Sequence, residues 1–151
     1  MHNKPMRLIA LLMLFWATTF AQTSEEKDAV ATAQKLFDGM AAKDAAAIHS
    51  VLLPDARFYA VRDDRPPSSI AGDAFAVQVG GMSGTLLERF TKPPQVLIRG
   101  RMAQVWGEYE FVRDGKFGHC GVDSFTLFHT AEGWKVAAIS YTSETTGCPG
   151  H

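Results

Sequence analysis

The Asp114-Gly115 dipeptide constrains the fold of this chain more than any other feature of its sequence. It separates two segments rich in β-branched and aromatic residues, 102–113 and 117–129, and Asp-Gly favours a two-residue hairpin turn. A second turn at 131–133 precedes another segment of the same kind, 134–143. We therefore predict that the C-terminal half is an antiparallel sheet of long strands joined by short turns.

The part of the chain before Gly84 has a helical character instead. Thr23 and Glu26 fit a capping box, and apolar residues then recur at helical spacing through 24–42. Asp44 is the expected N-cap of a shorter helix, and a third helix is expected to begin at Gly72. The shorter helix is expected over 45–52. Strands are expected over 56–61, 86–90 and 96–99, and a loop over 62–69. Pro93-Pro94 marks an edge or bent strand. Helices followed by a strand meander indicate the α+β class.

The first 21 residues have the pattern of a signal peptide. Lys4 and Arg7 precede an uncharged apolar run, 8–20, and Thr19-Phe20-Ala21 places small residues at the −3 and −1 positions of a cleavage site. An uncleaved N-terminal anchor is the alternative. We predict a signal peptide over 1–21, one domain over 22–151, and an exported protein, periplasmic or secreted, with no membrane association after cleavage.

Charge and cysteine content narrow the function classes. Residues 22–151 hold 13 basic and 16 acidic residues, a net charge of −3, without a basic stripe, so nucleic-acid binding is not expected. Cys120 and Cys148 are a disulfide candidate in an exported chain, because antiparallel pairing of the last two strands brings them together. Two independent thiols are the alternative. Two cysteines are too few for a common structural zinc site.

The hairpin turn predicts which side chains share a face of the sheet. If Asp114 and Gly115 form the loop, Glu110 lies opposite His119, and Trp106 lies opposite Asp123. Side chains alternate along a strand, so one face is predicted to carry Trp106, Glu108, Glu110, His119, Asp123, Phe125 and Leu127. The opposite face would carry Tyr109, Phe111, Cys120, Val122 and Thr126.

Three carboxylates and an imidazole among apolar residues suggest a pocket with a general acid or base. Asp123 and His119 are the catalytic candidates, and Trp106, Glu108, Glu110, Phe125 and Leu127 are the predicted pocket residues. For Glu108 and Glu110, a solvated outer face near the turn is the simpler interpretation. For Asp123 we favour the functional one, because it precedes Phe125 and Leu127 at alternate positions. No metal site is expected, since a second histidine at suitable spacing is absent from these strands.

The layout resembles the nuclear transport factor 2-like superfamily, including its SnoaL-like and ketosteroid-isomerase-like branches. The resemblance rests on the long first helix followed by KDAAAIHSVLLPDARFYAV, on AQVWGEYEFVRDGKF, and on GWKVAAISYTSE. It implies a cone in which N-terminal helices pack on a bent, mostly antiparallel sheet, with a pocket inside. The catalytic residues of the family do not carry over to positions in this chain.

Two functions remain after these arguments. The first is an exported pocket protein that binds a small, partly apolar molecule or acts on it as an isomerase or lyase without a cofactor. The second is a non-catalytic interaction module that forms a homodimer through the outer face of its sheet.

Overall fold

The structure is a computed structural model that describes residues 22–151. The predicted signal peptide, 1–21, lies outside these residues. Within 22–151, no helix combines the length and the apolar character needed to cross a membrane.

The described residues form three helices, α1 (Ser24–Ala42), α2 (Ala45–Val51) and α3 (Gly72–Gly80), and the first two begin where the capping signals predict them. Thr23 and Glu26 make the predicted capping box, because the Thr23 hydroxyl accepts from the Glu26 amide and the Glu26 carboxylate accepts from the Thr23 amide. Helix α1 ends at Lys43, whose backbone is left-handed with φ 52°. Asp44 then caps α2, since its carboxylate accepts from the Ala47 amide.

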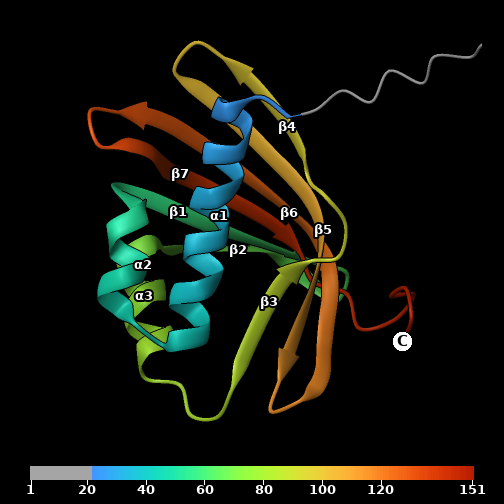
Figure 1. Cartoon of the computed structure of the whole chain (residues 1–151). Coiled ribbons are helices and arrows are strands. Elements are labelled where there is room, and N and C mark those ends of the chain that lie inside the picture. Colours follow the sequence, from blue (N-terminus) through green and yellow to red (C-terminus); the bar gives the residue numbers. More distant parts are fainter. Residues whose placement is uncertain (1–21) are drawn as a thin grey trace, which may run out of the picture.

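Seven strands form one bent sheet in the order β2-β1-β7-β6-β5-β3, with β4 also paired to β5 (Figure 1). Within residues 22–151 only the β1–β7 pair is parallel, so the sheet is mostly antiparallel, as expected. The strands are β1 (Leu52–Arg62), β2 (Arg65–Ala71), β3 (Leu86–Phe90), β4 (Gln95–Arg99), β5 (Met102–Arg113), β6 (Lys116–Thr130) and β7 (Gly133–Thr142).

The prediction of a loop over 62–69 is wrong for most of that range, because β2 begins at Arg65 and contains Pro66 and Pro67. Proline lacks the amide proton that a central strand needs. Strand β2 lies at the edge of the sheet and pairs only with β1. The prolines therefore cost no hydrogen bonds to a second neighbouring strand.

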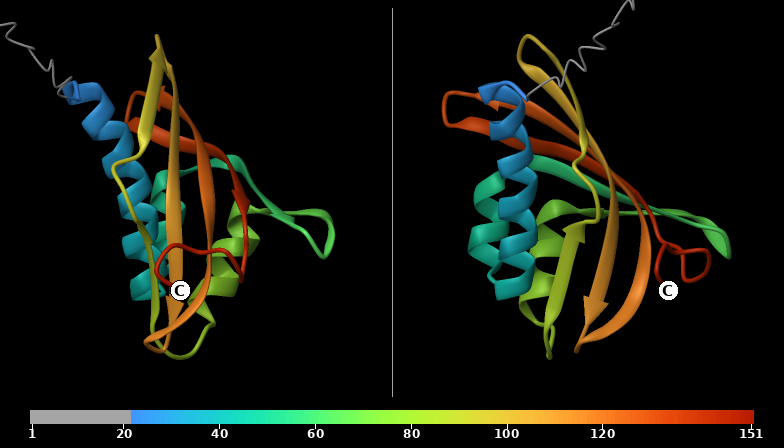
Figure 2. Two further views of the ribbon diagram at one scale, coloured as in Figure 1. Left: turned by 90° about the vertical axis from the view of Figure 1, so that its right-hand side faces the viewer. Right: turned by 45° about the vertical axis from the view of Figure 1, so that its right-hand side comes forward.

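All three helices lie on the concave side of the sheet (Figures 1 and 2). Their apolar residues, among them Leu36 and Phe37 of α1, form the core with the inward side chains of the strands. Phe37 packs edge-on against Phe90 and Phe125, with ring centroids 5.1 and 5.7 Å apart. Together these layers give the α+β cone that the sequence predicts.

The C-terminal segment, 143–151, runs on the side of the sheet away from the helices (Figure 2). Cys148 forms a disulfide with Cys120 of β6, with Cα atoms 5.9 Å apart, so the predicted pairing is confirmed. Glu144 also exchanges two backbone hydrogen bonds with Cys120, at 2.9 and 2.8 Å. The segment is therefore attached to the sheet covalently and by backbone hydrogen bonds.

The predicted register of the β5–β6 hairpin holds next to the turn and fails beyond it. Arg113 pairs with Lys116 and Val112 with Phe117, as predicted, but His119 pairs with Phe111 instead of Glu110. Gly118 is the extra residue of a β-bulge at this point. From there on, β5 is shifted by one residue relative to the prediction, and the face of each of its side chains is reversed.

Candidate functional site

A cavity of about 270 Å³ lies between the helices and the concave face of the sheet. Its apolar wall consists of Leu36, Met40, Phe58, Ile70, Phe75, Val79, Met82, Leu86, Phe111, Phe125 and Ile139. The other lining residues carry polar or charged groups: Arg62, Gln78, Glu88, Arg113, His119, Asp123 and Tyr141. An apolar cavity with a few converging polar groups is the general form of a small-molecule site.

Asp123 is the most deeply buried charged residue at this cavity. It lies in β6 between Gly107 of β5 and Tyr141 of β7, and its residue exposure is 2%. Its Oδ2 atom has no hydrogen-bond partner within the part of the chain that the structure describes. Burial, and next the nearby Glu88 carboxyl, raise the pKa of Asp123 well above its ordinary value.

Glu88 is the second carboxyl at the cavity, and the sequence analysis missed it. Leu86, Glu88 and Phe90 alternate toward the interior along β3, and Glu88 pairs with Phe111 of β5. Burial raises the pKa of Glu88 to about 8. Two carboxyl groups with raised pKa values therefore share this cavity.

His119 is held by one aromatic ring on its face and one hydroxyl at its edge. Its ring stacks on Phe111, with centroids 4.9 Å apart, and its Nδ1 lies 3.1 Å from the Tyr109 hydroxyl. That hydroxyl donates its only proton to the Thr142 carbonyl at 2.7 Å, so it accepts from Nδ1–H. Burial, and next the charge of Arg62, lower the pKa of His119. Neutral His119 therefore leaves Nε2 unprotonated and able to act as a base.

The two arginines at the cavity are not ion-paired to its carboxyl groups. The Arg62 guanidinium lies over the Tyr141 ring, 5.8 Å from its centroid. Arg113 is half exposed, and its Nε lies 4.0 Å from the Asp114 carboxylate. Over 22–151, neither Glu88 nor Asp123 makes an ion pair with lysine or arginine.

The cavity brings together only part of the predicted site. His119, Asp123 and Phe125 line it, whereas Leu127 is buried in the core nearby. The bulge at Gly118 turns Trp106, Glu108 and Glu110 to the outer face, so their assignment to the pocket is wrong.

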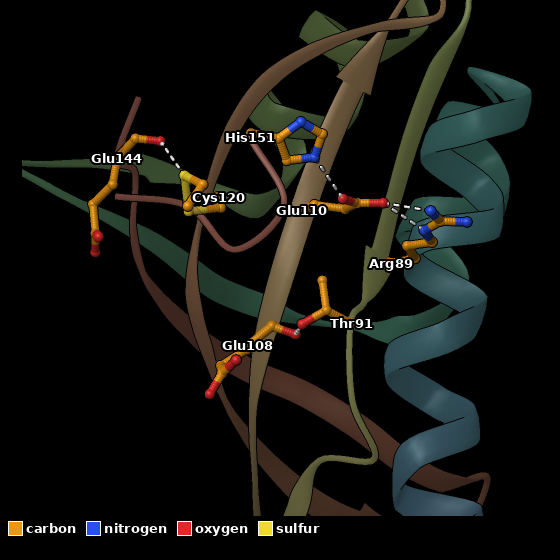
Figure 3. Close-up of polar contacts among 8 residues, drawn as sticks. Arg89, Thr91, Glu108, Glu110, Cys120, Glu144 and His151 are labelled. Carbon is orange, nitrogen blue, oxygen red and sulfur yellow. Dashed lines mark hydrogen bonds and ion pairs between the residues drawn. A yellow bond between two sulfur atoms is a disulfide. The ribbon is translucent and has the colours of Figure 1, made fainter. Parts of the chain in front are cut away.

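Glu108 and Glu110 instead make surface contacts on that outer face (Figure 3). The Glu110 carboxylate accepts from Arg89 Nε at 2.7 Å and lies 3.4 Å from His151 Nε2. The hydrogen bond from Arg89 lowers the pKa of Glu110. Glu108 lies 2.8 Å from the Lys92 ammonium group. The Glu108 side chain is 39% exposed, which fits the solvated surface that was the simpler interpretation, whereas the Glu110 side chain is only 13% exposed.

Tyr109 and Phe111 were assigned to the face away from the pocket, and this assignment is also wrong. Phe111 lines the cavity, and Tyr109 is buried beneath His119 with 1% exposure. Among the residues that the structure covers, no group of three or more histidine, cysteine, aspartate or glutamate side chains is arranged to hold a metal ion.

No family model matches this sequence. No curated protein matches it significantly. Solved structures do match. An NTF2-like superfamily protein from Salmonella enterica superimposes with a TM-score of 0.66 at 14% identity, covering 85% of this chain and 96% of its own. An NTF2-like protein of unknown function from Shewanella baltica gives 0.63 at 15% identity, covering 83% and 100%.

A third match is a provisionally assigned dehydratase of the NTF2-like family from Streptomyces avermitilis. It gives a TM-score of 0.66 at 16% identity, covering 80% of this chain and 96% of its own. At these identities the likeness extends to the fold, which is the α+β cone of NTF2-like proteins.

Proposed function

We propose that this chain is a pocket protein that takes up a small, partly apolar molecule and acts on it as an isomerase or lyase without a cofactor. The observation that carries the proposal is Asp123, a buried carboxyl whose Oδ2 atom has no hydrogen-bond partner among the described residues, in an apolar cavity that His119 also lines. Leaving a buried polar atom without a partner costs free energy. A ligand that contacts this atom would recover that free energy.

The protonation states of the site support proton transfer. An unprotonated His119 Nε2 can remove a proton from a substrate carbon, and a protonated carboxyl of Asp123 or Glu88 can return one to another atom. An isomerase or a lyase needs both steps, and neither requires a cofactor. One structural neighbour is provisionally assigned as a dehydratase, and dehydration is a lyase reaction.

We also propose that the protein acts outside the cytoplasm. The disulfide between Cys120 and Cys148 is of the kind that persists in oxidising compartments. The signal-peptide pattern over 1–21 supports the same conclusion. N-terminal sequencing of exported protein should return Gln22, and recovery of Met1 would contradict the proposal.

A thermal-shift screen against a panel of metabolites tests the pocket. A ligand that binds only the folded state raises the melting temperature. We expect Asp123→Asn to abolish the ligand-induced shift with an unchanged or raised melting temperature, because the substitution removes an unfavourably buried acid. The matched control is Glu108→Gln on the outer face, which should keep the shift. Ligands that stabilise wild type and Asp123→Asn equally would rule out this site.

The outer face supports a second candidate, a module that forms a homodimer. Leu97, Met102, Trp106 and Phe128 expose between 42% and 73% of their surface on neighbouring positions of β4, β5 and β6. Met102 pairs with Phe128, and Leu97 pairs with Gln104, which lies between Met102 and Trp106. Large exposed apolar side chains gathered on one face are typical of an interaction surface. Sedimentation should then give a dimer that Leu97→Asp converts to a monomer. A monomeric wild type would exclude this candidate.

A further inference from the structure

We propose that the cavity recognises a protonated amine on a small apolar body, with the ammonium group held between Glu88 and Asp123. The inference rests on the proposed function, because it names the ligand class of the same cavity. It begins from two acidic side chains that face the cavity from different strands, β3 and β6.

The first argument is that, among the described residues, these acids have no positively charged partner. Asp123 is 2% exposed and its Oδ2 atom is unpartnered, and no lysine or arginine in 22–151 forms an ion pair with either acid. A buried carboxylate is stable only with a compensating charge or with hydrogen-bond donors. An ammonium group supplies both, because it carries one positive charge and up to three N–H donors.

The second argument is the aromatic part of the cavity wall. Phe58, Phe75, Phe111 and Phe125 line the cavity. Phe58 and Phe75 meet edge to face, with centroids 4.3 Å apart. Aromatic faces attract cations and also bury apolar surface. The wall therefore fits both the ammonium group and the hydrocarbon body of an amine.

Other charged and titratable groups face the same space. They are His119 on β6, Arg113 on β5, Arg62 on β1 and Tyr141 on β7, while α1 and α3 contribute only uncharged side chains. Tyr109 is not among the lining residues, but its hydroxyl is hydrogen-bonded to His119. Arg62 is positive and opposes a cation, but it rests over the Tyr141 ring and forms no ion pair with either acid. Arg113, next to β3, is also positive, but it is half exposed and its Nε lies 4.0 Å from the Asp114 carboxylate. The favourable position for an ammonium group is thus beside the two acids, Glu88 and Asp123.

The pH dependence of the affinity distinguishes an amine from other ligands, because only an ammonium ligand displaces a proton from a carboxyl group. Burial raises the pKa of Glu88 to about 8, so below that pH an ammonium ligand must displace a proton from a carboxyl. Release of one proton makes the affinity rise about tenfold between pH 6 and pH 7. A neutral carbonyl ligand would instead accept a hydrogen bond from the protonated acid, and its affinity would fall as the pH rises through about 8.

Three probes with one apolar body test the inference: benzylamine, benzyl alcohol and benzoate. Each is titrated into the purified chain at about pH 6 and about pH 7, with calorimetry and with NMR of the His119 ring. We expect benzylamine to bind tightest, with proton release and the tenfold pH effect. Glu88→Gln should weaken benzylamine about tenfold and leave benzyl alcohol nearly unchanged, because only the cation uses the negative charge. Glu108→Gln is the matched control and should change neither.

The outcomes separate the two proposals. Tighter binding of benzyl alcohol or benzoate in the cavity would overturn the amine inference and leave the pocket function standing. Benzylamine binding that Glu88→Gln and Asp123→Asn do not weaken would also overturn it. If none of the three probes shifts the His119 ring, both the inference and the proposed pocket are contradicted.

Discussion

His119 carries a defined tautomer because its hydrogen-bond partner already donates its own proton elsewhere. The Tyr109 hydroxyl donates to the Thr142 carbonyl, and it can then only accept from His119 Nδ1–H. The atom of this ring that can act as a base is therefore Nε2. Tyr109 does not need to touch the ligand to determine which atom of His119 takes a proton, so it is a positioning residue.

We predict that Tyr109→Phe changes the tautomer of His119 with little change in the fold. Tyr109 is 1% exposed and phenylalanine preserves its ring, so the change removes only the hydroxyl, which accepts from His119 and donates to the Thr142 carbonyl. The ¹⁵N chemical shifts of the His119 ring should move from a pure Nδ1–H form to a mixture of tautomers. Tyr59→Phe is the control, because Tyr59 is 41% exposed on the outer face. A His119 ring that stays purely Nδ1–H in Tyr109→Phe would show that the hydroxyl does not select the tautomer.

The site was only partly predictable at the level of residues. His119, Asp123 and Phe125 alternate along one strand, so the sequence alone could place them on one face. Glu88 gave no such signal, because it lies in a five-residue strand between Leu87 and Arg89 and could face either way. Only its pairing with Phe111 shows that it faces the cavity.

At the level of elements, the β5–β6 hairpin shows why register is hard to predict beyond a turn. Strand β6 contains two glycines, and each could mark a bulge. Gly118 is the bulge, and a Cβ there would lie 3.1 Å from the Phe111 ring. Gly121 keeps its register, and it is small because a Cβ would lie 2.3 Å from the Thr142 carbonyl oxygen. The sequence contains both glycines but not the packing that distinguishes them.

The helices and most strands were predictable because their signals are local. Capping residues, apolar periodicity and turn dipeptides act within a few positions of the element they define. The edge strand β2 was missed because its prolines usually indicate a loop, and its edge position depends on the whole sheet.

We predict that removal of the disulfide lowers the stability of the domain but leaves its cavity intact. The bond joins residues 28 positions apart, and the loss of this constraint on the unfolded chain corresponds to about 3–4 kcal/mol. Cys120 pairs with Glu110 on the outer face, so Cys120→Ser with Cys148→Ser should not change ligand affinity. Denaturant unfolding and a ligand titration measure the two effects. An unchanged unfolding free energy would mean that backbone pairing alone holds the C-terminal segment.

At the level of the whole molecule, the cavity makes folding stability depend on pH. Glu88 and Asp123 have raised pKa values in the folded state, so the folded chain binds more protons than the unfolded chain. The contribution of Glu88 to stability is complete below the ordinary carboxyl pKa and is lost as the pH rises toward about 8, and Asp123 acts in the same sense. His119 has a lowered pKa and acts in the opposite sense, because its neutral form stabilises the fold only as the pH rises toward 6.5.

We predict that Glu88→Gln stabilises the domain at pH 8 and has little effect near pH 5. At pH 8 the unfolded chain gains free energy by ionising Glu88, whereas the folded chain holds it half protonated in an apolar cavity. Glutamine removes that difference, and the gain should be on the order of 1–2 kcal/mol, since Glu88 is partly exposed. Denaturant unfolding across this pH range gives the difference curve, and Glu108→Gln should give a flat one. If Glu88→Gln instead gives a pH-independent change, the carboxyl is ionised in the cavity, and an ammonium ligand would bind without releasing a proton.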